Sequence, residues 1–204
     1  GHESDPWRTR PDPSWIGAPS FGRGHTHYDD SRGYFRDEAD FPGPRTLATA
    51  SRWLEHDAPH HERFLLFVDE FDPHEPFDTP EPYASLYDPD WRGPHLIWPP
   101  YSRAAIGDGV LTEREARQVR ACYGAKLTMI DHWFGKLLDE LDAQDLWDTT
   151  AVIVCTDHGH YLGDKRAAGA PGDATRADIW GKPMVPQFEP LGHTPLMIHW
   201  PRDY

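Results

Sequence analysis

A short apolar run that ends in a carboxylate and an imidazole most constrains what this chain can fold into. Residues 151–155 read Ala-Val-Ile-Val-Cys, a β-branched run typical of a strand buried on both faces. The run leads directly into Thr156-Asp157-His158-Gly159. Ligands of open α/β sheets bind at the carboxyl ends of the strands, and both side-chain types bind divalent metals. The pattern predicts half of a metal site at Asp157 and His158; the alternative is a solvated turn after a strand.

Other segments predict the elements around this strand. Residues 46–56 have the apolar spacing of an amphipathic helix with a threonine at its N-cap, and residues 64–68, FLLFV, predict a second buried strand. Thr112, with Glu115 three residues later, opens a helix of about thirty residues through a capping box. Residues 195–200 predict a third strand. This order predicts an α/β fold with a largely parallel central sheet flanked by helices.

Composition limits the classes of partner and the number of domains. A chain of 204 residues can bury one core, so we expect one domain, with an extended surface loop at residues 1–45 and an α/β core at residues 46–204. The net charge of −14 argues against a nucleic-acid partner. No apolar stretch approaches the roughly 18 residues that a transmembrane segment needs. We expect Cys122 and Cys155 to be small core residues rather than a disulfide.

Several blocks, in order along the chain, resemble the sulfatase family of the alkaline-phosphatase superfamily. They are FLLFVDEFDPHEPF (64–77), which looks like the family's strand and Pro-His-x-Pro turn, YGAKLTMIDHWFGKLLDEL (123–141), TDHGHYLGD (156–164), WGK (180–182) and HTPLMIHWP (193–201). The resemblance covers residues 46–201. It implies an alkaline-phosphatase-like fold and a sulfuric ester hydrolase that uses a metal to hydrolyse a sulfate monoester of a small molecule or a carbohydrate.

The resemblance also implies roles for individual residues. Asp157 and His158 match the metal-ligand pair, and the metal of related sulfatases is usually calcium. His74 matches the histidine that contacts the sulfate ester, and Lys182 matches the lysine that contacts a sulfate oxygen. The chemistry agrees, because a cation stabilises charge on the nonbridging oxygens and an imidazolium can protonate the leaving oxygen. As alternatives, His74 could merely order its loop and Lys182 could be a solvated lysine, with Lys165 as its nearest rival.

The nucleophile expected from the resemblance is a formylglycine made within a Cys/Ser-x-Pro-x-Arg motif. Neither cysteine fits, because Cys122 is followed by Tyr-Gly-Ala and Cys155 by Thr-Asp-His. The family's first strand and its paired aspartates are not recognised either. We therefore expect a partial sulfatase domain whose remainder is supplied in cis or by another chain, and which has no turnover by itself.

One departure from the family pattern keeps a second hypothesis open. His193 stands where many sulfatases have an arginine, and zinc phosphodiesterases of the superfamily place a metal-binding histidine near that point. With His193 as a further ligand, zinc or manganese would be favoured over calcium, and the protein would be a phosphodiesterase or a phosphonate-ester hydrolase. A non-catalytic anion-binding remnant is the third possibility. The Trp- and Pro-rich stretches at 7–21 and 91–101 are expected to line the pocket for the organic portion of the substrate.

Overall fold

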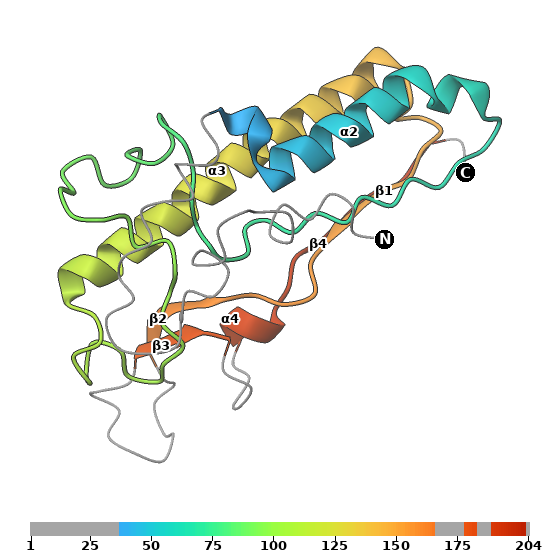
Figure 1. The fold of residues 1–204 in the computed structure, drawn as a ribbon. Helices are drawn as coiled ribbons and strands as arrows, with labels where there is room; N and C mark the ends of the chain where they lie inside the picture. Colours follow the sequence, from blue (N-terminus) through green and yellow to red (C-terminus); the bar gives the residue numbers. More distant parts are fainter. Residues whose placement is uncertain (1–36, 166–177, 183–188, 203–204) are drawn as a thin grey trace, which may run out of the picture.

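The computed structural model describes residues 37–165, 178–182 and 189–202 (Figure 1). Most of the predicted loop at 1–45, including the aromatic stretch at 7–21, lies outside the described residues. The part of that loop that is described contains the short helix η2 (Glu38–Asp40) and the first residues of helix α2.

Helix α2 (Pro42–His56) begins earlier than the sequence predicts. The residue before the helix is Phe41, and the two prolines of PGPR lie in the first turn. Proline is compatible with that turn because the first backbone N–H groups of a helix have no partner within it. The prediction of an N-cap at Thr46 was wrong for this reason: prolines that looked like loop residues belong to the start of the helix.

The long helix α3 (Glu113–Ala143) begins where the sequence predicts. The Thr112 hydroxyl accepts a hydrogen bond from the Glu115 backbone N–H, and the Glu115 carboxylate accepts one from the Thr112 N–H at 2.8 Å. Helix α2 lies alongside the carboxyl half of α3 (Figure 1), where Leu47 and Leu54 share an apolar cluster with Leu137. None of the described helices is both long enough and apolar enough to cross a membrane.

The described strands form two antiparallel pairs. Strand β1 (Val152–Cys155) pairs with β4 (Leu196–His199), and β2 (Tyr161–Lys165) pairs with β3 (Asp178–Gly181). The short helices η3 (Ala58–His60) and α4 (Glu189–Gly192) complete the described fold. The strands expected near 151–155 and 195–200 are confirmed. The predicted parallel sheet is not, because both described pairings are antiparallel.

The predicted strand at 64–68 is extended but pairs with no other described strand. Its side chains alternate: Phe64, Leu66 and Val68 pack against the cluster between α2 and α3, whereas Leu65 and Phe67 are 93% and 82% exposed. The segment therefore has the side-chain alternation of a strand and one covered face, but its backbone pairs with no strand in the described part of the chain.

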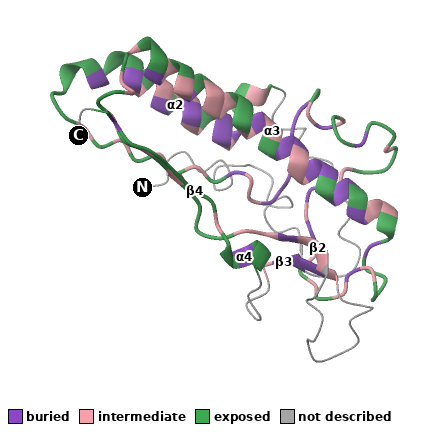
Figure 2. Cartoon of the chain, turned by 180° about the vertical axis from the view of Figure 1, so that it is seen from behind, coloured by how far each residue is buried: buried purple, intermediate pink, exposed green. Residues whose placement is uncertain are grey.

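The β1–β4 ribbon also has an uncovered apolar face, which is largely green in Figure 2. The prediction that β1 is buried on both faces is wrong for the described structure, because Ile153 is 59% exposed and Cys155 is also exposed. Cys122, by contrast, is buried as expected. Large exposed apolar side chains on this ribbon and on the extended segment at 64–68 are unusual for a monomer surface. They are Leu65, Phe67, Ile153, Leu196, Met197, Ile198 and Trp200.

Candidate functional site

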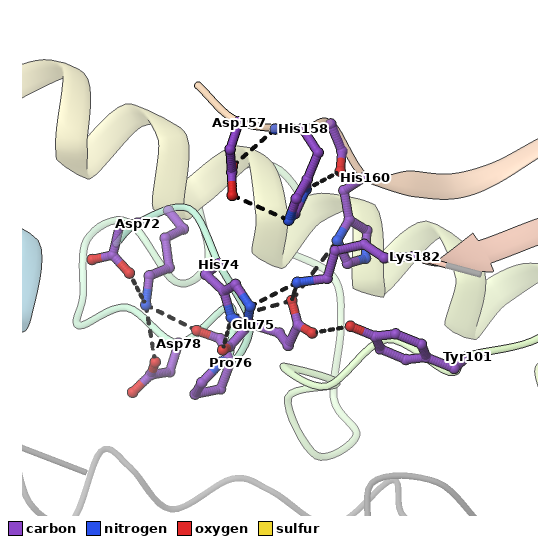
Figure 3. Close-up of polar contacts among 12 residues, drawn as sticks. Asp72, His74, Glu75, Pro76, Asp78, Tyr101, Asp157, His158, His160 and Lys182 are labelled. Carbon is purple, nitrogen blue, oxygen red and sulfur yellow. Dashed lines mark hydrogen bonds and ion pairs between the residues drawn. The ribbon is translucent and has the colours of Figure 1, made fainter. Parts of the chain in front are cut away.

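Five polar side chains from four distant parts of the chain meet beside the amino half of α3 (Figure 3). This polar cluster consists of His74, Glu75, Tyr101, His160 and Lys182. Each of the other four is joined to Glu75 by a hydrogen bond or by an ion-pair contact within 4.0 Å. Glu75 is therefore the centre of the cluster, and it immediately follows the histidine that the sequence singles out.

His74 and Lys182, 108 positions apart in the chain, are in direct contact. Lys182 Nζ lies 2.7 Å from His74 Nε2, and His74 Nδ1 lies 2.7 Å from the Glu75 carbonyl oxygen. An ammonium only donates and a carbonyl only accepts, so the tautomer that satisfies both contacts has its proton on Nδ1 and its lone pair on Nε2. His74 is thus neutral in this arrangement, and its Nε2 faces the ammonium group.

Glu75 is buried and ionised. Its Oε2 lies 3.2 Å from Lys182 Nζ and 3.4 Å from His74 Nδ1, and its side chain is only 6% exposed. The Tyr101 hydroxyl donates a hydrogen bond to Oε1. Burial opposes ionisation, but the Tyr101 hydrogen bond and the Lys182 ammonium are among the contacts that outweigh it, and the pKa of Glu75 is lowered.

His160 forms the inner wall of the cluster. Its ring packs edge-on against Phe77 at 5.4 Å between ring centroids. Burial lowers the pKa of His160 to about 4; the Glu75 carboxylate opposes this shift and Lys182 adds to it. His160 is therefore uncharged at neutral pH.

Asp157 and His158 lie together at the end of β1, on the side of the cluster nearest His160 (Figure 3). The Asp157 carboxylate accepts a hydrogen bond from the His158 backbone N–H at 2.8 Å, and its other oxygen lies 3.7 Å from His158 Nε2. Slight burial opposes the shift, but these two contacts lower the pKa of Asp157. Its side chain is 84% exposed, so the carboxylate is ionised and accessible.

Lys182 is positioned by the end of β3 and by the loop that carries Tyr101. The backbones of Ser102 and Trp180 exchange hydrogen bonds at 3.2 and 2.8 Å. Gly181 has a φ of 80°, a conformation that side chains disfavour, and a Cβ there would approach the Tyr101 ring to 2.8 Å. The glycine lets the ring lie against the backbone, which brings Tyr101 and Lys182 to the same carboxylate.

The turn that carries His74 is held from behind by a buried lysine. Lys126, on α3, is fully buried; its Nζ donates to the Pro76 carbonyl oxygen at 2.9 Å and pairs with Asp72 at 2.9 Å and Asp78 at 3.3 Å. Burial alone would lower the pKa of Lys126, but the two carboxylates outweigh it and raise the pKa. Lys126 therefore holds the chain before His74, at Asp72, and after it, at Pro76 and Asp78.

Glu70 is a third acidic group near this lysine, and its protonation makes stability depend on pH. Burial, followed by the charge of Asp72, raises the pKa of Glu70 from 4.5 to about 8. The folded state then binds more protons than the unfolded state between pH 4.5 and 8, so this contribution to stability is full below pH 4.5 and is lost as the pH rises towards 8.

We therefore expect Glu70→Gln to raise the melting temperature at pH 8 and to have little effect near pH 5. Thermal unfolding at the two pH values measures the difference. Glu62 is exposed, so Glu62→Gln is a matched control that removes a carboxylate away from the buried cluster, and its melting temperatures should follow those of the wild type at both pH values. Parallel pH profiles for wild type and Glu70→Gln would contradict the assignment of a protonated Glu70.

The described residues supply two donors for a metal rather than a full ligand set. No group of three or more His, Cys, Asp or Glu residues suited to a metal occurs in the described part of the chain. Asp157 and His158 fit as partial ligands, because both side chains are exposed and His158 Nε2 lies only 3.7 Å from an Asp157 carboxylate oxygen. His193 does not join them: it follows α4, is 77% exposed, and pairs with Glu189 at 3.0 Å.

Reasoning from the sequence missed two residues that shape this site, Glu75 and Lys126, which lie in a Pro-rich loop and in a helix. Tyr101 ends the stretch at 91–101 that is expected to line the pocket, but its contact with Glu75 was not predicted. A lysine in a row of core positions, between Ala125 and Met129, was the available signal for Lys126. No signal in the sequence links Tyr101 to Glu75, because only the fold brings these loops together.

A possible nucleophile motif was also missed. Ser4-Asp5-Pro6-Trp7-Arg8 has the letters of Ser-x-Pro-x-Arg. It lies outside the described residues.

Comparisons with known proteins agree with the resemblance drawn from the sequence. The family model described as Sulfatase matches residues 18–204.

Three relatives share parts of the chain. It is 31% identical over 132 residues to the multifunctional alkaline phosphatase superfamily protein PehA of Trinickia caryophylli, covering 53% of this chain and 26% of that protein. It is 26% identical over 184 residues to a choline-sulfatase of Rhizobium meliloti, covering 82% and 32%. An arylsulfatase of Clostridium perfringens is 26% identical over 110 residues, covering 50% and 23%. The matched segments span between 23% and 32% of the length of these relatives. The match over residues 18–204 shows that the chain belongs to the sulfatase family, with its alkaline-phosphatase-like α/β fold.

Proposed function

We propose that the protein carrying this chain hydrolyses a sulfate monoester with the help of a divalent metal. The observation that carries this proposal is the 2.7 Å contact between Lys182 Nζ and His74 Nε2, beside the ionised and exposed Asp157. Two relatives are named choline-sulfatase and arylsulfatase, which supports a sulfate ester of a small molecule or carbohydrate as the substrate.

Lys182 would act on the sulfate group and His74 on the leaving oxygen, the two ends of the S–O bond that breaks. The Lys182 ammonium binds a nonbridging sulfate oxygen and stabilises the charge there. As it turns towards that oxygen it releases His74 Nε2, which can then carry a proton. With its Nδ1 proton held by the Glu75 carbonyl oxygen, an imidazolium at His74 donates the Nε2 proton to the leaving oxygen as the S–O bond breaks.

Sulfatases generally use a divalent metal, and Asp157 and His158 are the residues of this chain that would hold it. Such an ion supplies positive charge to the sulfate oxygens. We propose calcium, since an exposed carboxylate suits a hard cation. The further ligands would come from polypeptide outside the described residues.

We also propose that more of the sulfatase domain, in cis or from another chain, covers the apolar face of the β1–β4 ribbon. Two observations support this. The extended segment at 64–68 has no partner strand among the described residues, and the exposed side chains on and beside the ribbon are large and apolar. The matched relatives are also three to four times longer than the segment they share with this chain.

The first test is turnover by residues 1–204 alone, which we expect not to exceed background with an aryl sulfate or a phosphate diester. The described residues supply charge and positioning, but they contain no group of three or more residues suited to hold a metal. We therefore expect this chain alone to bind the metal too weakly for turnover, whether or not the motif at residues 4–8 supplies a nucleophile. Hydrolysis of a sulfate ester by this chain would contradict the expectation. If Ser4→Ala then abolished that hydrolysis, the nucleophile would be assigned to the motif at residues 4–8.

The second test is the dependence on the leaving group in the intact protein. We expect His74→Ala to lower kcat/KM about 10²- to 10⁴-fold for alkyl sulfates, and much less for 4-nitrophenyl sulfate, because a good leaving group needs no proton. A series of aryl sulfates of graded leaving-group pKa measures this difference. An equal loss across the series would mean that His74 only orders its loop.

The same assays can distinguish the sulfatase proposal from the phosphodiesterase alternative. The sulfatase proposal requires that His193→Ala leave sulfate hydrolysis nearly unchanged, since His193 pairs with Glu189. A preference for phosphate diesters with zinc, lost in His193→Ala, would replace the sulfatase proposal with a phosphodiesterase.

A further inference from the structure

The polar cluster has a feature that sulfate-ester binding does not require: a buried carboxylate at its centre. Glu75 Oε2 lies 3.2 Å from Lys182 Nζ, 3.4 Å from His74 Nδ1 and 3.8 Å from His160 Nδ1 (Figure 3). A site that only had to attract an anion would be expected to exclude a negative charge from this position. Glu75 therefore works against anion binding, and it does so next to both groups that would bind the anion.

Any anion held by this site must lie close to Glu75. An oxygen that accepts a hydrogen bond of about 2.8 Å from Lys182 Nζ lies within about 6 Å of a carboxylate that is itself 3.2 Å from that nitrogen. At such distances in a buried site the repulsion between two charges is substantial. Because Coulomb repulsion is proportional to charge, an ester with two negative charges is repelled twice as strongly as an ester with one.

Lys182 and Glu75 also cancel each other in charge. His74 is neutral in the contact with Lys182, so the described cluster offers a net charge near zero to an incoming ester. The carboxylate has little freedom to rotate away, because Tyr101 donates a hydrogen bond to its other oxygen and the side chain is only 6% exposed. Its charge is therefore a fixed part of the pocket.

We propose that Glu75 makes this pocket select singly charged esters, such as sulfate monoesters, over doubly charged phosphate monoesters. The inference rests on the proposed function, in which His74 and Lys182 bind the reacting group. A sulfate monoester carries one negative charge at all working pH values, whereas a phosphate monoester carries two above its second pKa, about 6. The two esters have nearly the same shape, so charge is the property by which the pocket can distinguish them.

The test compares 4-nitrophenyl sulfate with 4-nitrophenyl phosphate at pH 8 in the intact, metal-loaded protein. We expect Glu75→Gln to raise kcat/KM for the phosphate ester relative to the sulfate ester at least about tenfold, because glutamine keeps the size of the side chain and removes its charge. Asp139→Asn, which removes an exposed carboxylate elsewhere on α3, is the matched control and should leave the ratio unchanged.

A second measurement covers the case in which Glu75→Gln does not fold. In the wild type, the preference for the sulfate ester should shrink as the pH falls from 8 to about 5, where the phosphate ester has lost its second charge. The ratio of the two substrates is the readout, so a change in overall activity with pH does not affect it. An unchanged ratio at the two pH values would overturn the inference.

The outcomes also separate this inference from the proposed function. If the wild type hydrolyses neither a sulfate ester nor a phosphate ester, the proposed function fails. If the wild type hydrolyses the sulfate ester and Glu75→Gln lowers both substrates equally, with the metal content unchanged, the proposed function stands and the role of Glu75 in selection is overturned.

Discussion

Replacing Asp157 by alanine is expected to lower the turnover of a sulfate ester by the intact protein to background, a loss of at least about 10³-fold. Asp157 is the ionised, accessible carboxylate of the two proposed metal ligands. The His158 backbone N–H and imidazole favour its ionised form. Among the described residues, its removal leaves only the His158 imidazole of the proposed pair to hold the ion. The measurement is kcat/KM together with the metal content of the purified protein.

The matched control for this variant is Asp148→Ala. Asp148 is an exposed carboxylate just before β1 that pairs with Arg202 at 3.6 Å, so it tests the effect of removing a charge near the strand without touching its carboxyl end. We expect the control to keep both metal and activity. Full activity and unchanged metal content in Asp157→Ala would show that the metal is held elsewhere.

Replacing Lys126 by methionine is expected to destabilise the fold by about 3–5 kcal/mol. The methionine fills the space of the lysine stem, but Asp72 and Asp78 then remain buried without their cation. The Pro76 carbonyl oxygen also loses its donor. Chemical denaturation, followed by the fluorescence of the tryptophans, measures the loss in free energy of unfolding.

A triple variant separates the charge effect from packing. Adding Asp72→Asn and Asp78→Asn to Lys126→Met removes the unpaired carboxylates, so it should recover most of the lost stability. Lys126→Arg keeps the charge and should lose less than Lys126→Met. A Lys126→Met protein as stable as the wild type would mean that the three charged groups contribute nothing to holding the turn.

Local rules predicted the helices better than the strands. The start of α3 followed from Thr112 and Glu115 alone, because a capping box is satisfied within four residues. The segment at 64–68 has the composition and the side-chain alternation of a strand, yet it pairs with no described strand. Whether a strand forms depends on a neighbour that supplies hydrogen bonds, and that neighbour is not encoded in the strand itself.

The site was predictable to the extent that it follows family motifs. The sequence by itself determined the candidates: Asp157 and His158 as adjacent residues after an apolar strand, and His74 and Lys182 by resemblance. Adjacent residues at a strand end must lie near each other, so the first pair needed no tertiary information. The roles of all four stay predictions until activity is measured.

Only the tertiary structure decided which groups surround these candidates. It brought Lys182 to His74 across 108 positions and placed the carboxylate of Glu75 within 3.4 Å of both side chains. It also set Lys126 behind the turn and left His193 with Glu189. The reason is physical: hydrogen bonds and ion pairs act over a few ångströms, and for residues far apart in the chain those distances are set by the packing of α3 and β3 against the loops rather than by any local pattern.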